Sequence, residues 1–116
     1  MFADTPDPPY VAVIFTSRRA DHEDVEYSIA TRRMEELAAM QPGYLGIESV
    51  RDSETRLGIT VSYWATEDAA RSWKQVAEHV DAQRAGAAKW YDAYEVRIAR
   101  VTRAYGSEAR QEDRRR

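Results

Sequence analysis

Residues 10–17 read YVAVIFTS, and this stretch decides the fold. Successive side chains of a strand point to opposite faces of its sheet, and both faces are apolar here. One face carries Val11, Val13 and Phe15, and the other carries Ala12 and Ile14. A β-branched and aromatic run of this kind is typical of a strand that is buried on both sides. We therefore predict a strand that needs a cover on each face.

An amphipathic helix is predicted directly after this strand, over residues 21–41. Asp21 can cap the free amide groups of its first turn, and Pro42 and Gly43 end it. Between these signals, apolar side chains recur every three or four residues, as they do on one face of a helix. That apolar stripe consists of Tyr27, Ala30, Met34, Leu37 and Ala38.

Two strands and a second helix follow. Residues 44–51 and 56–64 are predicted strands, and the polar segment 52–55 between them suits a hairpin turn. Thr66 is a candidate N-cap for the second helix, and the acidic residues after it favour the positively polarised first turn. The apolar stripe of this helix consists of Ala69, Trp73, Val76, Ala77 and Val80.

The chain ends with a fourth strand. We expect Gly86 to end the second helix or its extension, residues 87–91 to add one more helical turn, and residues 94–101 to alternate as a strand. The element order is then βαββαβ. That order matches the split arrangement of ferredoxin-like α+β folds, in which two helices lie on one face of a four-stranded antiparallel sheet.

The second face of this sheet has no cover within the chain. The two helices cover one face, and 116 residues leave no further element for the other. Because the strand at residues 10–17 is apolar on both faces, a second copy of the chain is the economical cover. We expect a homodimer joined through its sheets. A flexible arm over residues 1–9 and a charged tail over 106–116 flank the folded domain at 10–105.

Composition and charge exclude several classes of protein. The chain has no cysteine, which excludes thiol catalysis and cysteine-based zinc or iron–sulfur sites. Its two histidines are far apart and form no metal-ligand set. A net charge of −3 argues against binding to nucleic acid. No apolar run approaches the roughly 20 residues of a membrane helix, and no signal peptide is visible. We expect a cytoplasmic protein.

Three segments form a pattern that runs through the predicted fold. They read PGYLGIESVRD at 42–52, GITVSYW at 58–64 and TEDAARSWKQVAEH at 66–79. With Trp90 and Tyr91 before the last strand, this pattern resembles the antibiotic biosynthesis monooxygenase family of dimeric α+β barrel proteins. The resemblance covers residues 10 to 105. It implies a small homodimer with a pocket in each subunit, between the helices and the sheet.

The resemblance implies a cofactor-free monooxygenase that acts on a small aromatic or quinone-type metabolite. Members of the family include enzymes that oxidise such compounds with molecular oxygen, without metal or flavin, and others that bind and degrade haem. A substrate that forms a carbanion can itself donate an electron to oxygen. The protein then supplies an apolar pocket, polar groups for the ionised substrate and shielding from water. A non-catalytic dimeric ligand-binding or stress-associated protein, and a haem-binding homologue, are the alternatives.

Two departures from the family pattern bear on these alternatives. Characterised oxygenases and haem-degrading members use an Asn on the first strand, but this sequence contains no Asn, and the equivalent position near Ile14 and Phe15 is apolar. Haem-degrading members carry an axial His whose register, counted from Trp73, falls near Gln83. His79 stands elsewhere, so the pattern speaks against haem ligation unless a shifted segment presents His79.

His79 is the candidate catalytic residue. On a helical projection it lies about 60° from Val76, at the edge of the apolar stripe. There it can bind an anionic substrate or carry a proton near neutral pH, or it can be a surface histidine paired with Glu78 or Asp81.

Four aromatic residues are candidate walls of a pocket for a flat ligand. Core packing is the alternative for Trp73, and a dimer rim is the alternative for Trp90 and Tyr91. The four candidates are Trp64, Trp73, Trp90 and Tyr91.

Overall fold

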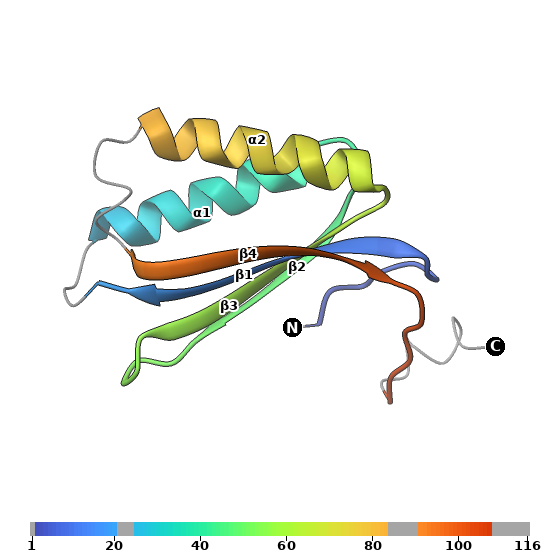
Figure 1. Cartoon of the computed structure of the whole chain (residues 1–116), viewed down its shortest axis with the longest axis horizontal. Coiled ribbons are helices and arrows are strands. Elements are labelled where there is room, and N and C mark those ends of the chain that lie inside the picture. The colour runs from blue at the N-terminus through green and yellow to red at the C-terminus, as the bar shows by residue number, and fades with distance from the viewer. Residues whose placement is uncertain (1, 21–24, 84–90, 108–116) are drawn as a thin grey trace.

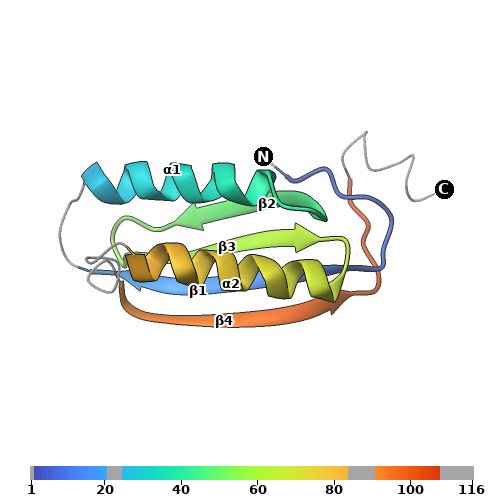
Figure 2. The same ribbon diagram turned by 90° about the horizontal axis from the view of Figure 1, so that it is seen from above.

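The computed structural model describes residues 2–20, 25–83 and 91–107, without the side chains of residues 25–26 and 79–83. The strands form one antiparallel sheet in the order β2-β3-β1-β4. Both helices lie on the same face of this sheet (Figures 1 and 2). The predicted ferredoxin-like α+β fold is confirmed. Its elements are β1 (Tyr10–Arg19), α1 (Val25–Ala39), β2 (Tyr44–Arg51), β3 (Leu57–Trp64), α2 (Glu67–Gln83) and β4 (Tyr91–Val101).

The strand register arranges the helix-facing side chains in rows that cross the sheet. At one end, Trp64 of β3 pairs with Val11 of β1 and with Tyr44 of β2, so the row is apolar on three strands, and Arg100 of β4 completes it at the edge. The row at the other end consists of Arg51, Gly58, Ser17 and Tyr94. The helix side of the sheet therefore has an apolar end and a polar end.

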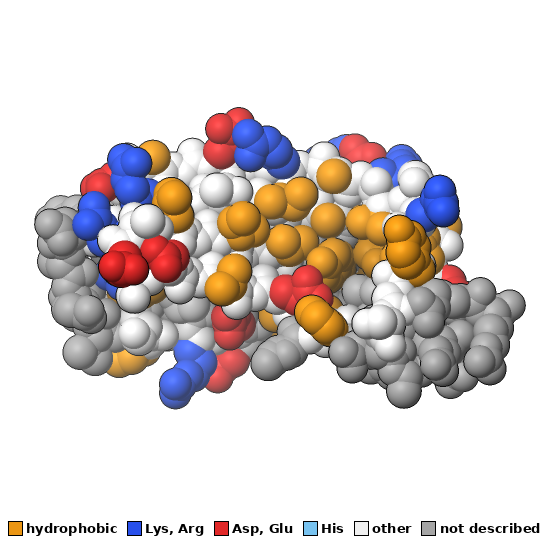
Figure 3. Space-filling view, turned by 90° about the horizontal axis from the view of Figure 1, so that it is seen from below, with side chains coloured by type: hydrophobic (Ala, Val, Ile, Leu, Met, Phe, Trp, Pro, Cys, Tyr) orange, Lys and Arg blue, Asp and Glu red, His pale blue; other side chains and the backbone are white. Residues whose placement is uncertain are grey.

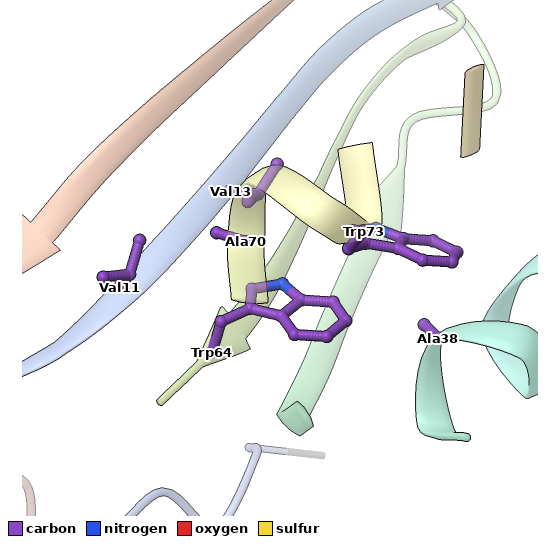
Figure 4. Packing of buried hydrophobic residues seen from close by; sticks show 6 residues of the cluster. All are labelled: Val11, Val13, Ala38, Trp64, Ala70 and Trp73. Atoms are coloured by element: carbon purple, nitrogen blue, oxygen red, sulfur yellow. The ribbon is translucent and has the colours of Figure 1, made fainter. Parts of the chain in front are cut away.

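The core lies at the apolar end, beneath α2. Trp64 is fully buried and stacks on Trp73, with the ring centroids 5.7 Å apart and an interplanar angle of 22°. Its indole Nε1 donates a hydrogen bond to Ser62 Oγ at 2.9 Å, which satisfies the one polar atom of the side chain. The buried cluster consists of Val11, Val13, Ala38, Trp64, Ala70 and Trp73 (Figure 4).

An N-cap and a glycine turn define the start of α2 and the turn that follows α1. Thr66 Oγ1 accepts a hydrogen bond from Ala69 N at 3.0 Å, so the predicted N-cap of α2 is confirmed. Gly43 has a φ of +84°, and a Cβ at this position would lie 2.6 Å from Ala69 Cβ. The turn after α1 can approach the start of α2 because residue 43 is a glycine. The predicted helix boundaries at Asp21 and Gly86 lie outside the described residues.

Neither helix, over the residues described, is long and apolar enough to cross a membrane.

The predicted hairpin turn between β2 and β3 is built around one carboxylate. Asp52 Oδ2 accepts hydrogen bonds from Thr55 N and Thr55 Oγ1, both at 2.7 Å. These bonds stabilise the charged form, so they hold the pKa of Asp52 below its ordinary value. Arg56 N donates to the Asp52 carbonyl oxygen at 2.8 Å, and Arg56 adopts a positive φ of 65°. The strand consequently begins at Leu57, one residue later than predicted.

The fourth strand begins earlier than the sequence predicts. Residues 94–101 were expected to form it, but β4 already begins at Tyr91, which pairs with Arg19 beyond an irregularity in the register. The predicted helical turn over residues 87–91 is therefore wrong for its last residue, and the rest of that turn lies outside the described residues. Tyr91 is extended rather than helical because its ring packs against Phe15 of the neighbouring strand.

The second face of the sheet carries neither helix, and hydrophobic side chains gather across it (Figure 3). The N-terminal segment crosses one end of this face, where Ala3 N donates a hydrogen bond to Glu48 Oε2 at 2.8 Å. Away from that segment, three aliphatic side chains stay largely accessible to solvent. They are Val50, Leu57 and Ile59, with exposed fractions of 71%, 50% and 44%.

Candidate functional site

Trp64 and Trp73 lie together in the core at the apolar end of the sheet. Their exposed fractions are 0% and 7%, and their rings stack on each other (Figure 4). Tyr44 packs edge-on against Trp64, with the centroids 5.7 Å apart. The faces of the two tryptophans are thus occupied by protein side chains in this chain, and their role as pocket walls stays a prediction.

The side chains of two further candidate site residues, His79 and Trp90, are not described by the structure. The backbone of His79 belongs to α2, but its side chain lies outside the described residues, as does all of Trp90. The expected role of His79 as an anion binder or proton carrier, and that of Trp90 as a pocket wall, stay predictions.

Tyr91 is the centre of an aromatic cluster on the helix side of the sheet. Its ring packs edge-on against Phe15, with the centroids 5.3 Å apart, and against Tyr27 of α1 at 5.9 Å. Tyr94 completes the cluster, with its ring centroid 5.7 Å from that of Phe15. Elements β1, β4 and α1 therefore bring together four rings that are distant in the sequence. We call Phe15, Tyr27, Tyr91 and Tyr94 the tyrosine cluster.

Two phenol groups of the tyrosine cluster touch. The Tyr91 hydroxyl donates a hydrogen bond to the Tyr27 hydroxyl at 3.3 Å. This bond joins the first residue of β4 to the first turn of α1. A phenol hydroxyl can donate and accept a hydrogen bond at once. This pair is therefore suited to holding the oxygen atom of a ligand, or to relaying a proton.

Two guanidinium groups border the tyrosine cluster. Arg19 Cζ lies 3.7 Å from the centre of the Tyr27 ring, at cation–π distance. Arg51 Cζ lies 5.9 Å from the centre of the Tyr91 ring. Arg51 Nη2 donates a hydrogen bond to Ser17 Oγ at 2.7 Å, and Nη1 donates to two backbone carbonyl oxygens at 2.6 and 3.3 Å. These bonds fix the Arg51 guanidinium on the helix side of the sheet.

Sequence reasoning missed Arg51 and Tyr27 as site residues. Tyr27 belongs to the apolar stripe of its helix, so it was expected in the core. Arg51 ends its strand next to a turn, where a charged residue is typical of a solvated end. A signal was available in Gly58, because a glycine inside a strand often marks the close approach of another group.

Hydroxyl groups line the sheet next to Arg51. Ser49 Oγ and Thr60 Oγ1 lie 2.7 Å apart, in the row beside the one that holds Arg51 and Gly58. Ser49 is exposed although it points to the helix side. The helix side of β2 is therefore exposed to solvent at Ser49, in the row next to the partly buried Arg51.

A hollow of about 310 Å³ lies on the helix-free face. Tyr63 Oη donates a hydrogen bond to Glu48 Oε1 there, at 2.8 Å. Burial and this carboxylate both raise the pKa of Tyr63, so its hydroxyl stays protonated and acts as a donor. The hollow is lined by residues of the N-terminal segment, of the sheet and of the segment after β4: Phe2, Ala3, Thr5, Tyr10, Glu48, Tyr63, Ala104, Tyr105, Gly106 and Ser107.

Known proteins share both the sequence pattern and the fold of this chain. Residues 9–85 match the family model described as antibiotic biosynthesis monooxygenase. An uncharacterised protein of Bacillus subtilis (strain 168), YqjZ, is 50% identical over 99 residues, which are 85% of either chain.

Solved structures with low sequence identity show the same fold. SnoaB from Streptomyces nogalater, a cofactor-independent oxygenase, is 17% identical and matches with a TM-score of 0.64, over 84% of this chain and 97% of its own. PA3566 from Pseudomonas aeruginosa is 14% identical and matches with a TM-score of 0.62, over 84% and 96% of the two chains. On the strength of the family match and the 50% identical relative, this chain belongs to the antibiotic biosynthesis monooxygenase family.

Proposed function

We propose that the protein is a cofactor-independent monooxygenase of small aromatic or quinone-type metabolites. Family membership and the fold shared with SnoaB support an oxygenase of this kind. The observation that carries the proposal is the tyrosine cluster, in which the Tyr27 and Tyr91 hydroxyls meet beside rings that pack edge-on, on the helix side of the sheet. Aromatic walls with a few placed polar groups are typical of sites for flat organic ligands.

The reaction needs only the substrate and molecular oxygen. An activated CH₂ group of the substrate loses a proton, and the resulting carbanion gives one electron to oxygen. The substrate radical and superoxide then join through a new C–O bond to form a peroxide. Cleavage of the O–O bond, with loss of the second C–H proton, gives a ketone and water. In sum, R₂CH₂ and O₂ become R₂CO and H₂O.

The protein contributes binding, orientation and proton transfer to this reaction. The tyrosine cluster would hold the substrate ring, with Tyr91 as one wall, and the Tyr27–Tyr91 hydroxyl pair would bind the substrate oxygen that carries the developing charge. His79 would accept or return the proton near neutral pH. Trp64 and Trp73 would support the site from the core, and Trp90 would be a further wall.

Oxygen uptake with anthrone tests the proposal. The protein should accelerate uptake above the uncatalysed rate, and Tyr91→Phe, which keeps the ring and removes the hydroxyl, should lower the catalysed rate about tenfold or more. Tyr105→Phe is the matched control, because Tyr105 is 77% exposed and lies outside the cluster. His79→Ala should also lower the rate. Uptake that stays at background with anthrone and with hydroquinones would contradict the proposal.

A non-catalytic ligand-binding protein is the second candidate. Phe15 favours it, because the resemblance implies an Asn near this position in characterised oxygenases, and a phenyl ring offers no hydrogen bond. Here the ring packs against Tyr91 and Tyr94 instead. This candidate predicts that anthrone binds without oxygen uptake.

We also propose that the protein is a homodimer joined through the helix-free face of its sheet. The exposed aliphatic side chains on that face support this arrangement (Figure 3). Burying them against a second copy removes apolar surface from water, which is the main driving force of association.

A further inference from the structure

We propose that Arg51 forms an anion-binding site for the ionised oxygen of a planar aromatic ligand. This inference rests on the proposed function, because it names the form of the substrate that the tyrosine cluster takes.

The Arg51 side chain crosses the sheet instead of turning out to solvent. It starts on β2, passes over Gly58 of β3 and reaches Ser17 of β1, where Nη2 bonds to the hydroxyl at 2.7 Å. A Cβ at Gly58 would lie 2.6 Å from Arg51 Cζ and 2.9 Å from both terminal nitrogens. Glycine at this position therefore provides the space in which the guanidinium lies.

The positive charge of Arg51 has no carboxylate partner among the described residues. Its hydrogen bonds go to the Ser17 hydroxyl and to the carbonyl oxygens of Ser17 and Arg56, which are all neutral. The carboxylate of Asp92 pairs with other cations, with Oδ2 at 3.5 Å from Arg18 Nε and 3.6 Å from Arg56 Nη2. A partly buried charge held only by neutral groups is stabilised further when an anion binds.

Donor groups of Arg51 remain for such an anion. A guanidinium carries five N–H groups, and the three bonds to described residues leave two of them, on Nε and Nη2. These neighbouring N–H groups of an arginine can bind an oxyanion together.

The surroundings select an aromatic ligand. The Tyr91 ring centre is 5.9 Å from Arg51 Cζ, and the Tyr27 hydroxyl is 3.3 Å from that of Tyr91. A flat ligand can stack against these rings while its ionised oxygen meets the guanidinium. The exposed Ser49 lies in the adjacent row of the sheet, so solvent reaches the helix side of β2 next to Arg51.

Two naphthoquinones of similar size separate charge recognition from ring stacking. 2-Hydroxy-1,4-naphthoquinone is an anion at neutral pH, and 2-methyl-1,4-naphthoquinone is neutral. Calorimetric titration of the full chain should give an affinity about tenfold higher for the anion. Arg51→Met should remove this preference and leave the affinity for the neutral quinone unchanged.

Two further variants keep the test decisive. Arg100→Met is the matched control, because Arg100 is 64% exposed and pairs with Glu67 at 3.7 Å, and it should keep the preference. Arg51→Lys keeps the charge without the paired donors, so it should retain part of the preference even if Arg51→Met does not fold. Equal affinity of the wild type for both quinones would overturn the proposal. So would a preference for the anionic quinone that survives in Arg51→Met, or one that is wholly absent from folded Arg51→Lys. The readout is binding alone, so a failure to consume oxygen would count against the proposed function and not against this site.

Discussion

The Tyr63 hydroxyl donates a hydrogen bond to the Glu48 carboxylate at 2.8 Å, from one strand to the next on the helix-free face. The second oxygen of the same carboxylate accepts a bond from Ala3 N. One acidic side chain thus holds both the sheet and the N-terminal segment. The pKa of Tyr63 is raised by burial first and by Glu48 second.

This raised pKa predicts a loss of stability at alkaline pH. The folded state keeps Tyr63 protonated, whereas the unfolded chain ionises it near the ordinary pKa of 10.0. The contribution of Tyr63 to the free energy of unfolding is therefore complete below that pH and decreases as the pH rises above it. Urea denaturation at about pH 8 and at about pH 10.5 measures how far the free energy of unfolding decreases between the two. This decrease should be smaller for Tyr63→Phe than for the wild type. Tyr105→Phe, at a side chain that is 77% exposed, should behave like the wild type. Parallel decreases in all three proteins would show that the Tyr63–Glu48 bond does not act in this way.

Gly43→Ala should destabilise the fold by about 2 kcal/mol or more, because it combines a strained φ of +84° with a Cβ 2.6 Å from Ala69 Cβ. Gly46→Ala is the matched control. Gly46 also has a positive φ, of 158°, and its Cβ would lie 2.8 Å from Ala3 Cβ, so the two variants differ mainly in the group that the new methyl meets. Ala3 belongs to the N-terminal segment, which can move more easily than a helix. Urea denaturation should therefore give a smaller loss for Gly46→Ala. Equal losses would mean that the contact between the turn and α2 is not the cause.

Ser62→Ala should lower the free energy of unfolding by about 1–2 kcal/mol, because it leaves the buried Nε1 of Trp64 without its acceptor. Ser49→Ala removes a hydroxyl from the pair that Ser49 of β2 forms with Thr60 of β3, but Ser49 is exposed and water can replace it. The loss for Ser49→Ala should be below about 0.5 kcal/mol in the same urea titration. A Ser62 variant as stable as the wild type would show that Trp64 finds another acceptor.

Ile59→Glu should convert the proposed dimer into a monomer. The side chain is 44% exposed on the helix-free face, and a carboxylate buried between two sheets would lose its hydration. Ile29→Glu is the control, because Ile29 is 63% exposed but belongs to α1. Light scattering coupled to gel filtration should give the mass of two chains for the wild type and for the control. A wild-type mass of one chain at micromolar concentration would contradict the dimer.

The sequence predicted the fold because its signals are local. The alternation of residues 10–17, the cap at Thr66 and the glycine turn at Gly43 each depend on a few neighbouring residues. The stacking of Trp64 on Trp73 was not predicted, because a helix stripe and a strand end predict burial but not which rings stack.

The site was harder to predict because its parts are far apart in the chain. Tyr27 and Tyr91 are 64 positions apart in the sequence, and their contact depends on where β4 starts. The path of Arg51 depends on the register of three strands, which brings Gly58 and Ser17 into one row. No periodicity in the sequence encodes that register.

The apolar and polar ends of the sheet have an evolutionary consequence. The tryptophan stack holds the helices on the sheet at one end, while Phe15 lies two rows and Arg51 three rows beyond it on the same face. Substitutions at separate sites add nearly independently. Substitutions in the tyrosine cluster or at Arg51 can therefore alter ligand preference without weakening the core. One fold can then acquire different chemistry while the residues that stabilise it stay the same.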